Sequence, residues 1–165
     1  MVDDHCMRKT FQMGQARMGE GTMKKQVLIT VKGSNHYEEN QMDAVEFLTT
    51  GDFYEKQGKY YIKYEEADQS GMPDTTTTLK IEPSRVTITR FGKNNSQMVI
   101  EQGKKHIGHY ETPYGGFTVG VISESADIRV NETSGRLDLK YDVELNDIVT
   151  SHNNICVTFK EVNGD

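Results

Sequence analysis

The chain has 165 residues, a formal net charge of −6, a pI near 5.4, two cysteines and no tryptophan. A single domain is the ordinary expectation for this length, which suffices to bury a core without disulfides or metals. The acidic balance and the absence of long basic runs argue against nucleic-acid binding, which needs a dense Lys and Arg surface.

The cysteines indicate a reducing compartment. Cys6 and Cys156 form no CxxC pair and no framework of a secreted domain, so we expect two free thiols. No apolar run has the length of a signal peptide or of a transmembrane helix. We therefore expect, by default, a cytoplasmic protein that has no membrane partner.

Residues 1–22 differ from the rest of the chain. They are rich in Met and Gly and show no sustained apolar period, whereas a strand pattern opens abruptly at Met23. We interpret residues 1–22 as disordered, or as an upstream or vector-derived extension, and residues 23–165 as one β-barrel domain. The alternative is a short helix or arm that docks on the barrel.

From residue 23 onward, apolar and polar residues alternate as they do on strands with one buried face. The first alternating stretch covers residues 26–32, and a second covers residues 45–49 before Gly51 and Asp52 interrupt it. A hairpin turn at residues 57–59 then leads into a strand whose inward side is predicted to carry Tyr60, Ile62 and Tyr64.

The middle of the chain has short strands separated by turns rich in Gly, Pro and Asn. Strands are predicted at residues 75–81, 86–90 and 98–100, with turns at 83–84, 92–95 and 102–104.

The last third of the chain has longer strands. Within residues 117–130 the apolar phase flips after Val121 to Ile122, and such a slip is typical of a β-bulge, which bends a sheet toward closure. Residues 137–145 give five successive matches to a period of two, and residues 155–159 form the last strand.

About nine or ten short strands with regular turns suggest a sandwich or a barrel. An up-and-down barrel satisfies the alternation and leaves no long exposed edge. The sequence therefore predicts an all-β fold, an antiparallel up-and-down barrel of roughly eight to ten strands.

Several segments, in their order and spacing, resemble the YwiB-like family of small bacterial proteins of unknown function. They are FLTTG at 47–51 followed by Tyr54, YYIKYEE at 60–66, TPYG at 112–115 and GRLDLKYDVELN at 135–146. The resemblance covers residues 24–161 and implies a calycin-like barrel, the shape of lipocalins and fatty-acid-binding proteins. It implies no catalytic motif and no cofactor.

Polar residues in phase with the buried face are the candidate ligand-binding residues. Alternation carries Glu66 and Arg90 inward, where a charge costs several kcal/mol unless it is paired. The two would then need each other, water or a ligand, and an arginine can hold a carboxylate or phosphate through two N–H groups. Alternatively, both lie at strand ends in solvent. Tyr60, Tyr64 and Tyr141 are either core residues with bonded hydroxyls or ligand contacts.

Other site chemistries have little support in the sequence. His106 and His109, three apart on a strand, fall on opposite faces and do not chelate a metal together. Neither a nucleophile motif nor a phosphate-binding loop is present.

Three functional hypotheses follow. The leading one is a non-enzymatic barrel that binds a small, partly apolar ligand. The second is an interaction or structural protein with a solid barrel, which a stable homodimer formed through an exposed apolar edge such as Leu28 or Leu48 would favour. The third is an enzyme with a spatially assembled site that uses Glu66 or His109 as acid or base.

Overall fold

The computed structural model describes residues 24–37, 42–66 and 74–162. Their strands form one closed antiparallel barrel in which each strand pairs with its neighbours in the sequence and β1 pairs with β10. The strands are β1 (Lys25–His36), β2 (Met42–Lys56), β3 (Lys59–Glu65), β4 (Thr76–Ile81), β5 (Arg85–Phe91), β6 (Asn95–Glu101), β7 (Lys105–Thr112), β8 (Gly115–Val130), β9 (Ser134–Leu145) and β10 (Ile148–Glu161). The predicted up-and-down barrel is confirmed.

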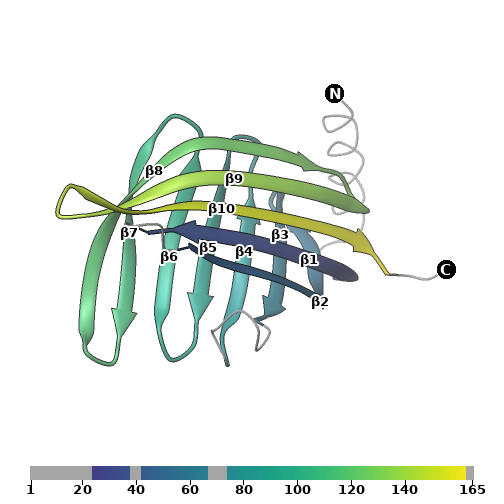
Figure 1. Ribbon diagram of the computed structural model, residues 1–165. Coiled ribbons are helices and arrows are strands. Elements are labelled where there is room, and N and C mark those ends of the chain that lie inside the picture. The colour runs from purple at the N-terminus through teal and green to yellow at the C-terminus, as the bar shows by residue number, and fades with distance from the viewer. Residues whose placement is uncertain (1–23, 38–41, 67–73, 163–165) are drawn as a thin grey trace.

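The barrel consists of two layers of strands that cross each other. Figure 1 shows β9, β10, β1 and β2 running across the direction of β3 to β7. The long strands β2 and β8 belong to both layers, because β2 pairs with β1 and then β3, and β8 pairs with β7 and then β9. Such corners need a bend or a bulge in the strand that turns them.

Gly51 forms the corner in β2. The expected interruption at Gly51 and Asp52 is wrong, because β2 continues through both residues. Gly51 pairs with Val27 on one side and with Tyr64 on the other, and a Cβ atom at this position would lie 2.5 Å from the carbonyl oxygen of Lys63. A glycine is required here because the neighbouring strand approaches too closely for any side chain.

A bulge forms the corner in β8. The predicted phase slip exists, but it lies between Ser123 and Ser125 rather than directly after Val121. Ser123 is buried and Ile122 is only half-buried, so the inward series continues through Ser123 before Glu124 is inserted. The polar side chain of Ser123 concealed this continuation from an apolar pattern. Because Ser123 is polar, it is not counted in an apolar pattern, and its hydroxyl accepts a hydrogen bond from the Glu101 amide at 3.1 Å.

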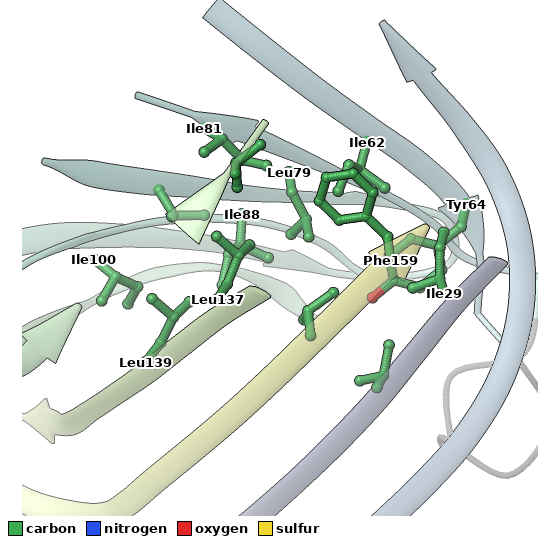
Figure 2. Packing of buried hydrophobic residues seen from close by; sticks show 14 of the residues in the cluster. Ile29, Ile62, Tyr64, Leu79, Ile81, Ile88, Ile100, Leu137, Leu139 and Phe159 are labelled. Carbon is green, nitrogen blue, oxygen red and sulfur yellow. The ribbon is translucent and has the colours of Figure 1, made fainter. Parts of the chain in front are cut away.

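Apolar side chains from both layers fill one half of the interior. Figure 2 shows Ile62 and Ile88 from one layer and Phe159 and Leu137 from the other in the same core. Around Phe53, the rings of Tyr60 and Phe159 lie at centroid distances of 5.2 and 4.8 Å. This packed half lies at the end of the barrel where the β2–β3, β4–β5 and β8–β9 turns are located.

Barrel closure places one of the two residues expected at an apolar dimer edge, Leu28, inside a strand that is paired on both sides. Leu28 lies on β1, which is hydrogen-bonded to β10 and to β2, whereas the segment of β2 that carries Leu48 pairs with β1 alone, because β3 pairs with β2 only from Gly51 onward. Leu48 is an exposed side chain on the outer face. Residues 1–22 and Cys6 lie outside the described residues, whereas Cys156 is a half-buried free thiol. None of the described segments forms a helix with the length and apolar character that a membrane crossing requires.

Candidate functional site

The other half of the barrel interior contains a cavity of about 1180 Å³. It lies at the end where the β5–β6, β7–β8 and β9–β10 turns are located, and we call it the hollow half. Its apolar wall includes Phe47, Leu79, Ile88 and Leu139. Its polar wall includes Tyr64, Glu66, Arg90, Ser96, Tyr110, Tyr141, Ser151 and Asn153.

Glu66 and Arg90 form an ion pair in the wall of the hollow half. Arg90 Nε lies 3.7 Å from Glu66 Oε2, and the Glu66 side chain is only 2% exposed while that of Arg90 is 18% exposed. The same carboxylate oxygen accepts a hydrogen bond from the hydroxyl of Thr77, which is fully buried. The alternative placement of both residues in solvent at strand ends is therefore wrong, because Glu66 follows β3 directly and keeps its inward phase.

The guanidinium of Arg90 has unused hydrogen-bonding capacity. Its Nε is buried and has no hydrogen-bond partner among the described residues. A buried donor that lacks an acceptor costs about 1–3 kcal/mol, so native interiors normally supply one. The Glu66 carboxylate balances the charge of Arg90, but at 3.7 Å it does not satisfy this donor. The site thus contains a cation that lines the cavity and whose buried Nε has no hydrogen-bond partner among the described residues.

Tyr64 and Tyr141 keep their protons well above neutral pH. Burial raises the pKa of Tyr64, and the adjacent Glu66 carboxylate raises it further. Burial likewise raises the pKa of Tyr141 to about 12, although the positive charge of Arg90 partly opposes this effect. At neutral pH the protonated hydroxyl of Tyr64 is hydrogen-bonded to Glu66, and that of Tyr141 is a hydrogen-bond donor.

The lining of the cavity also includes polar residues that the apolar pattern of the sequence did not indicate, namely Ser96, Tyr110, Ser151 and Asn153. Asn153 donates to the hydroxyl of Ser151 at 3.1 Å, and Ser96 is the register partner of both Arg90 and Tyr110. The hydroxyl of Tyr110 donates to the sulfur of Met98 at 3.5 Å. A period of two places Ser96 inward once the predicted strand at residues 98–100 is extended toward its start. The same extension of the predicted strand at residues 155–159 places Ser151 and Asn153 inward.

Two candidate residues lie elsewhere. Tyr60 stacks on Phe53 in the packed half and does not line the cavity. His109 is exposed on β7, beside the inward-facing Gly108, so it points away from the interior and does not meet Glu66. The structure thus brings Tyr64, Glu66, Arg90 and Tyr141 together in the hollow half and leaves Tyr60 and His109 outside it.

The charges that line the cavity balance. Asp43 and Glu66 are acidic, and Arg90 and Lys93 are basic, with Asp43 and Lys93 exposed at the mouth. Across the part of the chain that is described, no three His, Cys, Asp or Glu side chains are grouped so that they could hold a metal ion. Arg90 is therefore the main charged group that a molecule in the hollow half would meet through hydrogen bonds.

Comparison with known proteins identifies the family. The model of the family described as "Domain of unknown function (DUF1934)" matches residues 29–157, most of the barrel. The chain belongs to this family. It is 26% identical over 139 residues to the uncharacterized beta-barrel protein YwiB of Bacillus subtilis (strain 168), and the match covers 84% of the chain and 96% of YwiB. The resemblance to the YwiB-like family is confirmed.

A solved structure shows the same fold. The crystal structure of the ywiB protein from Bacillus subtilis matches this DUF1934 chain with a TM-score of 0.73 and 23% identity, covering 85% of the chain and 94% of the solved one. The family relationship supports the barrel and assigns no activity.

Proposed function

We propose that this protein binds one small, partly apolar molecule in the hollow half of the barrel. The observation that carries the proposal is the cavity of about 1180 Å³, whose lining combines apolar side chains with polar ones that include Arg90. Pockets for drug-sized ligands span about 300–1,000 Å³ and combine apolar walls with a few placed polar groups. The hollow half has the size and the lining for one such ligand with accompanying water.

The division of the interior supports the proposal. The packed half, with Phe53 and Phe159 in contact, holds the apolar core of the barrel, while the cavity occupies the other half. A solid barrel acting only as an interaction module would be packed at both ends, because empty volume costs dispersion contacts. A binding protein gains from a preformed cavity, since binding then requires little rearrangement.

Native mass spectrometry tests this function. The freshly purified protein is compared with its denatured mass, both as isolated and after addition of the uncharged probe N-phenyl-1-naphthylamine. We expect either a retained small molecule or a saturable complex with one probe. A bare native mass together with no saturable probe binding would refute the proposal.

Two matched variants locate the ligand. Ser96→Trp places a large side chain in the cavity wall beside Arg90, whereas Gln97→Trp places it on the exposed outer face of the same strand. We expect Ser96→Trp to weaken probe binding and Gln97→Trp to leave it unchanged. Because the chain has no other tryptophan, the fluorescence of each variant also reports whether it is folded. Equal binding by both folded variants would place the probe outside the hollow half.

A further inference from the structure

The proposed ligand must have a polar group that suits the donors of the hollow half. Arg90 carries five N–H groups, none of them hydrogen-bonded to a described residue, and its Nε is buried. The protonated hydroxyl of Tyr141 belongs to the same lining and donates to none of the described residues, while Lys93 adds a cation at the mouth. Arg90, Tyr141 and Lys93 thus place hydrogen-bond donors in the lining of the cavity.

Glu66 does not consume these donors. Its Oε2 accepts from Thr77 and remains 3.7 Å from Arg90 Nε, so it compensates the charge of the arginine without occupying its hydrogen-bonding edge. This arrangement lets an unliganded arginine remain in a largely buried position. The terminal nitrogens of the guanidinium make no hydrogen bond to a described residue, so an acceptor with two oxygens can bind them, the geometry in which arginine binds best.

Resting on the proposed function, we infer that the ligand is an amphipathic organic anion whose oxyanion, a carboxylate, sulfonate or phosphate group, is bound by Arg90 with Tyr141 nearby. The apolar remainder of the molecule packs against Phe47, Leu79, Ile88 and Leu139. A neutral carbonyl group would satisfy one donor, whereas an oxyanion has acceptors for the fork and for a hydroxyl together.

Two fluorescent probes separate the anionic group from the apolar body. 8-Anilinonaphthalene-1-sulfonate and N-phenyl-1-naphthylamine share the same aromatic skeleton, and only the first carries a sulfonate. We expect the wild-type protein to bind the sulfonate probe more tightly, in a saturable complex. Arg90→Gln is expected to weaken it by about tenfold to a hundredfold, the range for charge-assisted hydrogen bonds, and to leave the uncharged probe unchanged.

Control variants keep the test decisive if Arg90→Gln is unstable. The double variant Glu66→Gln with Arg90→Gln leaves no unpaired charge inside, so it is expected to fold and still lose preference for the sulfonate. Arg90→Lys retains the charge without the fork and is expected to bind with intermediate affinity. Lys63→Gln removes a cation from the exposed outer face of β3, outside the cavity, and is expected to change affinity little.

The outcomes distinguish the two proposals. If neither probe binds the wild type saturably, the binding function itself fails. The oxyanion assignment is overturned, and the ligand-binding function stands, if the uncharged probe binds and the sulfonate probe binds no better. The same conclusion follows if Arg90→Gln and the double variant weaken the binding of both probes equally.

Discussion

Gly51→Ala is expected to destabilise the barrel strongly, because Gly51 occupies the corner of β2 where three strands meet. The added Cβ would lie 2.5 Å from the carbonyl oxygen of Lys63, 2.8 Å from Cδ1 of Ile29 and 3.0 Å from Cβ of Tyr64. Two of these neighbours are backbone or Cβ atoms that cannot rotate away. Relieving the overlap means separating β2 from β3 and weakening a ladder hydrogen bond.

The magnitude follows from these two costs. Overpacking a core costs about 1–3 kcal/mol, and a weakened hydrogen bond adds about 1 kcal/mol, for a total of about 2–4 kcal/mol. In a chain of this size such a loss lowers the melting temperature by roughly 5–15 °C. Thermal and urea unfolding followed by circular dichroism measure both quantities.

Gly33→Ala is the matched control in the neighbouring strand. Its Cβ would lie 3.5 Å from Val45 Cγ1 and 3.8 Å from the Asn154 carbonyl oxygen, both ordinary contacts. We expect Gly33→Ala to remain within about 0.5 kcal/mol of the wild type or to be slightly more stable, since alanine loses less backbone entropy on folding than glycine. A Gly51→Ala protein as stable as Gly33→Ala would refute the argument from close approach.

Three further predictions concern the site and one turn. Glu66→Gln is expected to lower the free energy of unfolding in urea by about 1–3 kcal/mol, because Arg90 loses its counter-charge. Adding Arg90→Gln should recover part of this loss. If the effects of the two substitutions on the free energy of unfolding simply add, the two residues are not coupled. The pKa of Tyr141 is raised to about 12, so its contribution to stability is complete below pH 10 and is lost as the pH rises through 12. Unfolding of Tyr141→Phe should depend less steeply on pH in that window, and identical slopes would contradict this. Asn131→Ala removes an acceptor for the amides of Thr133 and Ser134, so it should lower the free energy of unfolding by about 1 kcal/mol or more. This loss is measured as a lower melting temperature.

Alternation along the sequence determined the fold and much of the site. Because side chains on a strand face opposite sides with a period of two, the inward positions of Tyr64, Glu66, Arg90 and Tyr141 follow from Ile62, Ile88 and Leu139 beside them. The same rule separated His106 from His109. It required no knowledge of which strands are neighbours, since the phase is a local property of each strand.

Only the tertiary structure decided which inward residues meet and where the interior is empty. Tyr60 and Tyr64 share one face of β3, yet Tyr60 packs on Phe53 and Tyr64 borders the cavity, because their heights along the barrel differ. The ion pair of Glu66 with Arg90 depends on β3, β4 and β5 being adjacent in register, with Tyr64 opposite Thr77 and Thr77 opposite Arg90. Strand register and barrel closure bring together residues that are distant in sequence, and a one-dimensional pattern carries no information about the space that remains between them.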